Sequence, residues 1–553
     1  MKFNKHLLLI TGVLAVMLVL AGCGNNSSST KSSKQMAKDQ TINLSTSSEI
    51  STLDIAKASD SGSLTPLYQI SEGIYRLGPK SKVENGLATS TKVSNDGLTY
   101  TFKLRTNDKW NNGQPVTAKD FVYGWRRVVN PKTAAGYSYL FEGVKNYSAI
   151  QKGHLSANKL GVYAPNSHTL VVKLSHPVPY FKLLLAFPTF FPQQESAVKK
   201  YGSRYGTSSG TSSATTAYNG PFVLSKWNGT SDTWTMTKNP NYWDKKHVKA
   251  HQLDFQVIKT PSTGLSLYQQ NKLDVISLSG EEVPTYKNRP EFKKFVGGST
   301  MYLEMNQKRV KALKNTKVRQ ALSRIINKQT LASQVLRDGS TAPKGFVSTN
   351  FFRNPKTGAD FAKDAYEKDG VAYNQSQAKK LWQQGMKQVG QKKLHLSLLS
   401  DDTDQSKKTT QYLQSQFNKL PGLSITIHNV PTKSKLSRST SGDFDLVVSS
   451  WGADFADPIN FLDLLTKSNP TNNGHWVNAT YDKYIEASKT TDANNPDKRY
   501  DDLVNAEKVL MKDQGIIPLY QPATTQLWRT NIHGFVWNPA GMSNGYKGLY
   551  VTK

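Results

Sequence analysis

Two patterns in the sequence have residue types and spacings that could support chemistry. Residues 206–210 read Gly-Thr-Ser-Ser-Gly, the spacing of a serine-hydrolase nucleophile elbow, which needs a strand before the serine and a helix after it. His247 and His251 are four residues apart, but the pair lacks the glutamate of a zinc protease. The serine motif lies in a Ser/Thr/Gly-rich stretch, residues 202–216, which predicts a surface loop. We therefore expect no catalytic residue, no metal ligand and no cofactor, and predict that the protein is not an enzyme.

The chain has one cysteine, Cys23, which excludes an internal disulfide framework and Cys-x-x-Cys redox chemistry. Two lysines precede an uncharged stretch at residues 7–21, and Leu20-Ala21-Gly22 leads directly to the cysteine. A charged start followed by a short apolar run is typical of a secretory signal. The sequence around Cys23 resembles the lipobox of bacterial lipoproteins. This resemblance implies cleavage before Cys23 and attachment of a diacylglyceryl group to its thiol, and two acyl chains anchor a protein stably.

The N-terminal region predicts where the protein resides. Residues 1–22 are expected to be a lipoprotein signal peptide, and residues 23–40, rich in Ser, Asn and Lys, a flexible tether. We expect the protein at the extracytoplasmic face of the cell membrane, held by its lipid anchor at a Gram-positive cell surface.

The chain is strongly basic. Its 553 residues contain 71 Lys and Arg against 40 Asp and Glu, for a formal charge of +31. Such a charge favours nucleic acid or an anionic surface as a partner. The lysines, however, are spread over the whole chain rather than collected in a stripe with interleaved aromatic residues. We interpret the charge as a generally basic, solvated surface and predict no nucleic-acid partner.

Hydrophobic periodicity predicts strands and helices mixed along the chain. Leu98, Tyr100, Phe102 and Leu104 fall on one face of a strand. Further elements are predicted as a strand at 42–44, a helix with a capping box at Thr117 and Asp120, an apolar helix stripe at 318–326, strands at 393–399, 423–428, 444–448 and 516–520, and a mostly helical stretch at 485–510. Strands alternating with helices over 390–450 suggest an α/β unit.

Five segments occur in an order that points to one family. They are Glu72–Leu77 with Leu87-Ala88; Leu98–Arg105 with Lys109–Gly113 and Val116–Tyr123; Asn219–Phe222 through Trp227 to Asn239–Asp244; Val318–Leu322 with Pro343; and Trp451–Pro458. Together, behind the lipobox, they resemble the oligopeptide-binding (extracellular family 5) solute-binding proteins of peptide ABC importers. The resemblance extends from about residue 42 to the C-terminus.

The resemblance implies an α/β fold of the periplasmic-binding-protein type, class II or cluster C, with two α/β lobes joined by a hinge and an extra α+β domain. Domain I is expected to comprise residues 40–75, 206–300 and 523–553, domain II residues 76–205, and domain III residues 301–522. Two lobes of such proteins close over a ligand about a hinge.

A receptor for peptides of varied sequence must bind what all peptides share, namely the backbone and the charged N-terminus. By resemblance, Asp454 binds the peptide α-ammonium, and a buried ammonium does require a hydrogen-bonded anion. Trp451, Gly452 and Ala453 are expected to supply backbone partners, while the Trp451 indole either lines a side-chain pocket or packs in the core. The remaining peptide-binding candidates are the backbone of Glu49, Ile50 and Ser51, and a ligand-facing tyrosine at Tyr137 or Tyr139.

One position departs from the family pattern. The best-known members have an arginine shortly before the Trp-x-Ala-Asp segment that helps to bind the C-terminal carboxylate of short peptides. Val448 stands at about that position here, with Arg438 upstream as a candidate substitute. Because a neutral residue cannot fix ligand length by an ion pair, we hypothesise that longer peptides are tolerated or that their C-termini protrude.

The sequence therefore predicts a lipid-anchored, extracytoplasmic receptor. It would bind oligopeptides in an interdomain cleft as a monomer and deliver them to the permease subunits of an ABC transporter. Two alternatives stay open at this point. One is a family member specific for a signalling peptide or a non-peptide solute, and the other is a basic adhesin that binds the cell wall.

Overall fold

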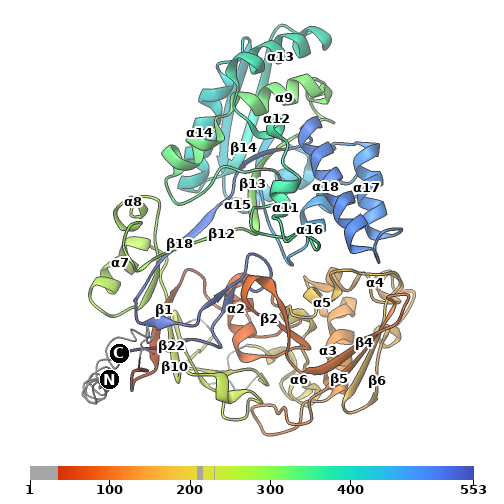
Figure 1. The fold of residues 1–553 in the computed structure, drawn as a ribbon, viewed down its shortest axis with the longest axis vertical. Coiled ribbons are helices and arrows are strands. Elements are labelled where there is room, and N and C mark those ends of the chain that lie inside the picture. Colours follow the sequence, from red (N-terminus) through yellow and green to blue (C-terminus); the bar gives the residue numbers. More distant parts are fainter. Residues whose placement is uncertain (1–34, 208–215, 230) are drawn as a thin grey trace, which may run out of the picture.

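The computed structural model describes residues 35–207, 216–229 and 231–553 (Figure 1). The predicted signal peptide, Cys23 and most of the predicted Gly206–Gly210 motif lie outside these ranges. The fold is a mixed α/β structure, as expected. In Figure 1 a five-stranded sheet and its helices form the upper part of the molecule, and a seven-stranded and a four-stranded sheet lie below. The domain boundaries given above stay predictions.

The seven-stranded sheet draws its strands from three separate stretches of the chain. Strand β1 is parallel to β10 and β11, and the other pairs are antiparallel. Ile42 and Leu44 alternate with more exposed residues along β1 and are almost fully buried, the pattern of a strand with one face on the core. In sheet order the strands are β12 (Phe292–Val296), β18 (Ala523–Trp528), β11 (Val275–Ser277), β1 (Thr41–Thr46), β10 (Gln252–Val257), β9 (Thr233–Lys238) and β8 (Phe222–Ser225).

The four-stranded antiparallel sheet packs with helix α3 (Ala118–Val129). The helix begins with the predicted capping box, in which the backbone N–H of Thr117 donates to Asp120 Oδ2 at 2.7 Å. Its buried face carries Phe121, Trp125 and Val128, and the Trp125 indole donates to Phe190 O at 2.8 Å. The strands, in order, are β4 (Ala88–Val93), β5 (Thr99–Leu104), β7 (Thr169–Lys173) and β6 (Val162–Asn166).

The five-stranded sheet forms the centre of the upper part. Strand β14 is parallel to β15 and β16, whereas β13 is antiparallel to β16 and β17. Its strands, in order, are β15 (Leu423–Val430), β14 (Leu394–Asp401), β16 (Leu446–Gly452), β13 (Ser299–Met305) and β17 (Ile517–Tyr520). The larger helices around it are α9 (Thr316–Ile325), α13 (Gln375–Gln388), α14 (Asp404–Phe417), α15 (Thr432–Ser441), α17 (Ala479–Lys489) and α18 (Pro496–Asp513).

The stretch at 485–510 that was predicted to be mostly helical consists of two helices, α17 and α18. Residues 490–495 separate them, and the Asn495 side chain caps α18 by accepting from the N–H of Lys498 at 3.2 Å. Pro496 is the first residue of α18. Proline disfavours helical geometry at the residue before it and is well suited to a first helical position, so a new helix begins here.

Shorter elements complete the described part of the chain. The helices are α2 (Ser61–Ile70), α4 (Tyr147–Gln151), α5 (Phe181–Leu184), α6 (Glu195–Tyr201), α7 (Pro261–Gln269), α8 (Val283–Tyr286), α10 (Lys328–Thr330), α11 (Phe361–Asp364), α12 (Lys368–Val371) and α16 (Ile459–Leu462). The paired strands are β2 (Tyr75–Leu77) with β3 (Val83–Asn85), β19 (Ile532–His533) with β22 (Tyr550–Val551), and β20 (Val536–Trp537) with β21 (Asn544–Gly545). Within the described ranges, no helix is long and apolar enough to cross a bilayer.

The end of the predicted tether is bound to the body of the protein. The backbone N–H of Ala37 donates to Val551 O at 2.9 Å, and the Gln40 amide donates to the same oxygen at 2.8 Å. Gln40 is buried. The expectation of a flexible tether through residue 40 is therefore wrong for residues 35–40, because they hydrogen-bond to the C-terminal segment.

The upper and lower sheets are joined by two crossings of the chain. Gly297 and Gly298 connect β12 to β13, and Gln521 and Pro522 connect β17 to β18. Gly298 has φ +73°, and a Cβ atom placed on it would lie 1.3 Å from Pro539 O. Only glycine fits there, because it tolerates positive φ and has no side chain to collide with that carbonyl. The two crossings lie side by side, since β12 pairs with β18 and β13 pairs with β17.

Candidate functional site

The predicted Trp451–Asp454 segment continues from the end of β16 to the chain crossings. Thr300 of β13 pairs with Trp451, and Ser299 pairs with Gly452. The Ala453 N–H donates to Gly298 O at 2.7 Å, and the Ala453 carbonyl accepts from the N–H of Gly541 at 3.1 Å. Both backbone groups of Ala453 are therefore engaged within the protein in this conformation, and their pairing with a ligand stays a prediction.

Asn460 holds the segment in place through one oxygen. Its Oδ1 accepts from the Trp451 indole N–H at 2.9 Å and from the Asp454 backbone N–H at 3.1 Å. The Trp451 side chain is half-buried and packs against the main hydrophobic core. Asn460 was missed by the sequence analysis, since an asparagine two residues after Asp-Pro carries no signal of its own. It is a positioning residue for both predicted site residues.

Asp454 is a half-buried carboxylate at the meeting of the upper and lower parts. Its Oδ2 accepts from the Tyr139 hydroxyl at 2.8 Å. Burial raises the pKa of Asp454, and hydrogen bonds from Tyr139, Asn460 and Tyr137 oppose that rise. Among the described residues, no Lys, Arg or His forms an ion pair with this carboxylate. The arrangement leaves a partly desolvated anion without a cation, which is the condition that favours binding of a ligand ammonium.

Both tyrosines that were predicted as candidates face Asp454. The two rings lie 5.9 Å apart, and Tyr137 packs edge-on against Phe187 at 5.1 Å. Tyr139 is the second residue of the short helical turn η3 (Ser138–Phe141) and is 48% exposed. Burial, followed by the charge of Asp454, raises the pKa of Tyr137 to about 12 and raises that of Tyr139 still further. Both hydroxyls therefore stay protonated at neutral pH and act as donors.

A small cavity of about 10 Å³ lies on one side of Asp454, lined among others by Leu183, Phe187 and Gly541. A single ordered water needs about 10–15 Å³ of such space. In this conformation the Tyr139 hydroxyl occupies a donor position at the carboxylate.

The Glu49–Ser51 segment lies at the start of helix α2. The Ser51 N–H donates to Ser63 Oγ at 3.1 Å, while the Glu49 carboxylate extends to exposed Lys259 at 2.6 Å. Ile50 is buried. A Cβ on Gly62 would lie 2.1 Å from Glu49 O, so the segment contacts the first turn of α2 directly. Neither Glu49 nor Ser51 has a hydrogen bond to Asp454 in this conformation.

Asp60 lies between the Glu49–Ser51 segment and the tyrosines, because Ser63 hydrogen-bonds to both Ser51 and Asp60. Asp60 caps α2 by accepting from the N–H of Ser63 at 2.9 Å, and its charge also acts on Tyr137. The predicted residues are thus brought to one region of the molecule. Their direct contacts, however, are limited to Asp454 with the two tyrosines.

A cavity of about 320 Å³ lies beside the chain crossings. Its walls come from both sheets and are uncharged, with many backbone groups exposed to it. They comprise Phe295, Gly297, Gly298, Ser299, Gly452, Ala453, Pro522, Ala523, Thr524, Gln526, Trp537, Pro539, Ser543 and Asn544. Its volume is at the lower end of the range for small-molecule sites. The sequence analysis named Gly452 and Ala453 of this set and missed the others, although the Gly297-Gly298 pair was a visible signal for a turn or close approach.

Val448, at the position where the family resemblance implies an arginine, is neutral and inaccessible. Val448 is buried in the core of the five-stranded sheet, opposite Leu303 of β13. Arg438 of α15 donates through Nε to Asp443 Oδ2 at 2.9 Å. Its charge is therefore paired locally, and neither residue faces the residues gathered at Asp454.

The Asp457-Pro458 dipeptide that follows the site is structural, as its turn-forming sequence indicates. Asp457 Oδ1 accepts from the N–H of Ile459 at 3.0 Å. Both carboxylate oxygens also accept from the buried Arg499 guanidinium, at 2.7 and 2.9 Å. In the part of the chain that the structure describes, no group of three or more His, Cys, Asp and Glu is placed to hold a metal ion.

Comparison with known proteins gives the family. The model of the bacterial extracellular solute-binding proteins, family 5, matches residues 82–473. The dipeptide-binding protein of Lactococcus lactis is 36% identical over 566 residues, covering 100% of both chains. The solved structure of Listeria monocytogenes OppA bound to peptide is 37% identical, with a TM-score of 0.77, and covers 94% of this chain and 100% of that one. The structure of the pheromone receptor PrgZ is 36% identical with a TM-score of 0.77, covering 93% and 100%.

A two-part α/β fold with paired chain crossings and a candidate site between the parts is the architecture of a solute-binding protein. The chain belongs to the bacterial extracellular solute-binding proteins, family 5. This confirms the family to which the sequence motifs pointed.

Proposed function

We propose that this protein is an extracytoplasmic receptor that binds oligopeptides between its upper and lower parts and delivers them to an ABC permease. The observation that carries the proposal is Asp454. Its carboxylate is half-buried, lacks a cationic partner among the described residues and meets the Tyr139 hydroxyl across the two parts. A peptide α-ammonium supplies the missing cation and can donate to the carboxylate in place of that hydroxyl.

The remaining features support a peptide rather than a charged small solute. The cavity beside the crossings has neutral walls rich in backbone, which suits a ligand that is recognised by its own backbone. Relatives over nearly the whole length carry the names dipeptide-binding and oligopeptide-binding protein. Val448 is buried and uncharged, and Arg438 is paired with Asp443. Neither residue therefore offers a free cation to the carboxylate of a ligand. We infer that the ligand's C-terminal end is not fixed by those residues, so peptides of several lengths are accepted.

The proposal includes attachment to the membrane through a lipid on Cys23. Its support is the sequence around that residue, with cleavage expected after residue 22. A receptor held by two acyl chains stays at the membrane surface where its permease lies. Mass spectrometry of the mature N-terminus in a membrane fraction tests this part, with Cys23→Ser as the variant that should be released.

The decisive experiment is calorimetry with one peptide in two forms, with a free and with an acetylated N-terminus. The peptide is chosen by mass spectrometry of ligands that co-purify with the protein. Acetylation, or Asp454→Asn, is expected to weaken binding by about 2–5 kcal/mol, as for a broken buried charge pair. The exposed Asp402 provides a matched control, and Asp402→Asn should leave affinity unchanged. Equal affinity for both peptide forms would show that Asp454 does not bind the α-ammonium.

A further inference from the structure

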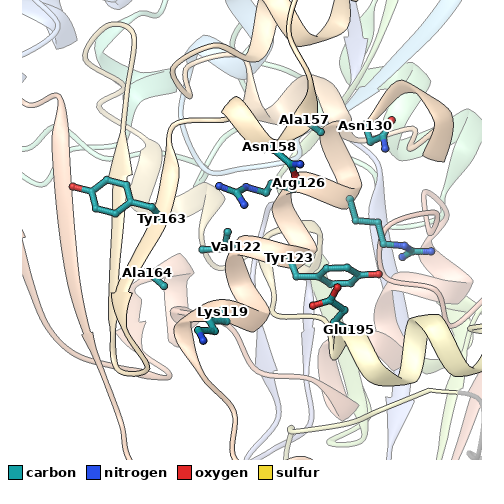
Figure 2. A pocket seen from close by; sticks show the side chains of 11 residues that line it. Lys119, Val122, Tyr123, Arg126, Asn130, Ala157, Asn158, Tyr163, Ala164 and Glu195 are labelled. Carbon is teal, nitrogen blue, oxygen red and sulfur yellow. The ribbon is translucent and has the colours of Figure 1, made fainter.

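A second pocket lies in the lower part, on the outer side of helix α3. It has a volume of about 670 Å³ and none of the residues predicted for peptide binding lines it. Helix α3 forms one wall with Lys119, Val122, Tyr123 and Arg126 (Figure 2). Arg127 of the same helix also lines the pocket. The other walls are formed by Tyr163 and Ala164 of strand β6 and by the turn η4 (Ala157–Lys159). Asn130 and Glu195 complete the lining. The residues at 119, 122, 123, 126 and 130 recur at helical spacing, so one face of α3 and its end carry this wall.

Arg126 is the unusual residue of this pocket. Figure 2 shows its side chain extending from α3 toward the strand that carries Tyr163. Its Nη2 donates to Val162 O at 3.4 Å, and its Nε is buried without an acceptor. No Asp or Glu of the described chain lies within 4.0 Å of it as an ion-pair partner. Burial lowers the pKa of Arg126, and no neighbouring carboxylate opposes that effect.

The most buried arginines of the described chain do have a carboxylate, whereas the half-buried Arg105 and Arg529, like Arg126, form no ion pair. Arg127, the next residue, donates both terminal nitrogens to Asp54, each at 2.6 Å. The four most buried arginines each form an ion pair, Arg76 with Glu72, Arg319 with Asp513, Arg324 with Asp369 and Arg499 with Asp457. A desolvated guanidinium without an anion is costly. Arg126 therefore has a donor set suited to an anion that comes from outside the chain.

The other charged groups of the pocket strengthen this reading. Lys119 is exposed at the rim and forms no ion pair within the described residues. Lys173 lies 5.8 Å from the centre of the Tyr163 ring. Glu195 is the one carboxylate of the lining, and it pairs with Lys199 at 2.8 Å. The field in the pocket is therefore positive, with Arg126 at its inner wall.

We propose that this pocket binds a small phosphate ester, with the phosphate held by Arg126 and Lys119 and the organic part against the Tyr163 ring. Phosphate matches the fork of guanidinium donors and carries up to two negative charges at neutral pH. A phosphate monoester thus brings a charge for each cation, whereas a carboxylate or a phosphate diester brings one and leaves the second cation unmatched. The volume is within the usual range for small-molecule sites and far exceeds what an oxyanion alone fills. The Tyr163 ring, 43% exposed, offers the organic part an apolar surface.

The test is calorimetric titration of the folded, peptide-free protein with sn-glycerol 3-phosphate at low ionic strength. Arg126→Gln is expected to weaken binding by at least about tenfold, because it removes the bidentate donor. Asn158→Glu, at an exposed lining position, places a carboxylate near Arg126 and should weaken binding similarly without disturbing the core. Arg289→Gln is the matched control, since Arg289 is exposed and outside the pocket.

Further probes separate the chemical class and source of the ligand. Glycerol should not bind, and inorganic phosphate should bind more weakly than the ester. Glycerophosphoglycerol, a diester, represents phosphate of a wall polymer, whereas the monoester represents a free solute. If the diester or the monoester binds more tightly, that compound identifies the source of the ligand, provided that Arg126→Gln weakens its binding. Undetectable binding of every phosphate at millimolar concentration, equal binding by wild type and Arg126→Gln, or binding of succinate in preference to phosphate overturns the proposal. Peptide affinity should be the same in Arg126→Gln and wild type, which separates this site from the proposed function.

Discussion

At the residue scale, the chemistry of this protein centres on an acid that is kept partly out of water. Asp454 has no cationic partner among the described residues and instead accepts from Tyr139. Burial raises the pKa of Asp454, and the tyrosine hydrogen bonds restrain that rise. The Tyr139 hydroxyl that meets Asp454 therefore also favours the ionised form of the carboxylate. We therefore expect peptide binding to weaken on acidification.

Peptide affinity is expected to fall on acidification, because only the ionised Asp454 attracts an ammonium. Since the folded pKa of Asp454 lies above the usual 3.8, the fall begins at a higher pH than for an ordinary aspartate. Tyr139→Phe removes a hydrogen bond that lowers this pKa, so the midpoint should move to still higher pH. Calorimetry from pH 4 to pH 7 measures both midpoints. Identical profiles for the variant and wild type would count against the role of Tyr139.

A second buried acid affects stability rather than binding. Burial raises the pKa of Glu507 to about 7 from its usual 4.5, although its Oε1 accepts from the N–H of Phe346 and Val347. The folded state therefore binds a proton that the unfolded state has released between those two values. The contribution of Glu507 to stability is fully present below about pH 4.5 and is lost as pH rises through about 7.

Glu507→Gln keeps the Oε1 acceptor but removes the titration. Relative to wild type, the variant should gain stability as pH rises from 5 to 7.5, by roughly 1–3 kcal/mol at the upper end. Thermal unfolding across this range measures the difference. Glu281→Gln is a control at an exposed glutamate of the seven-stranded part. Parallel pH curves for wild type and Glu507→Gln would contradict the assignment.

At the scale of elements, helices and strands follow their local sequence signals closely. The capping box at Thr117 begins α3 where the sequence places it. The predicted stripe at 318–326 corresponds to α9 and buries Val318, Leu322 and Ile325. The mostly helical stretch predicted at 485–510 is confirmed as α17 and α18, and Asn495-Pro496 is the local signal for the start of α18.

The crossing at Gly298 gives a sharp test of an element that joins the two parts. Gly298 and Gly390 have nearly equal φ, +73° and +70°, but a Cβ on Gly390 has no atom within 4 Å. Gly390→Ala should cost about 1 kcal/mol, from backbone conformation alone. Gly298→Ala should cost several times as much, because Pro539 must move as well. Chemical denaturation measures both, and equal costs would mean that the Pro539 contact relaxes freely.

At the scale of the whole molecule, a few side-chain contacts join the upper and lower parts. Contacts between the upper and lower parts include the Tyr139–Asp454 hydrogen bond and a stack of Tyr180 on Phe455 at 4.5 Å. The Asn494 amide also donates to Asp96 O at 3.4 Å. Each contact favours closure and thus opposes ligand entry. Apparent affinity then depends on the fraction of molecules that are open.

Phe455→Ala should shift the protein toward an open form, because it removes the stack with Tyr180 between the parts. Small-angle X-ray scattering is expected to give a larger radius of gyration than for wild type, and saturating peptide should restore the smaller value. Tyr366→Ala, at an exposed aromatic residue of the upper part, is the control. An unchanged radius in Phe455→Ala would show that other contacts hold the parts together.

The sequence by itself carried the motifs that point to the family, and its periodicity indicated the α/β class. Resemblance to that family, rather than periodicity, named Asp454, Trp451, Tyr137 and Tyr139 as candidates. Asp457 was indicated as structural because it precedes a proline. Motifs and periodicity rest on short-range spacing, which a single sequence carries completely.

Only the tertiary structure decided which of these residues meet. Tyr139 and Asp454 are 315 positions apart, and Asn460, the chain crossings and the pocket at Arg126 have no local signal that assigns them. The structure also shows that residues 35–40 are hydrogen-bonded to the C-terminal segment. The physical reason is that burial, charge pairing and closure depend on contacts between distant segments. Sequence spacing alone does not encode those contacts in readable form.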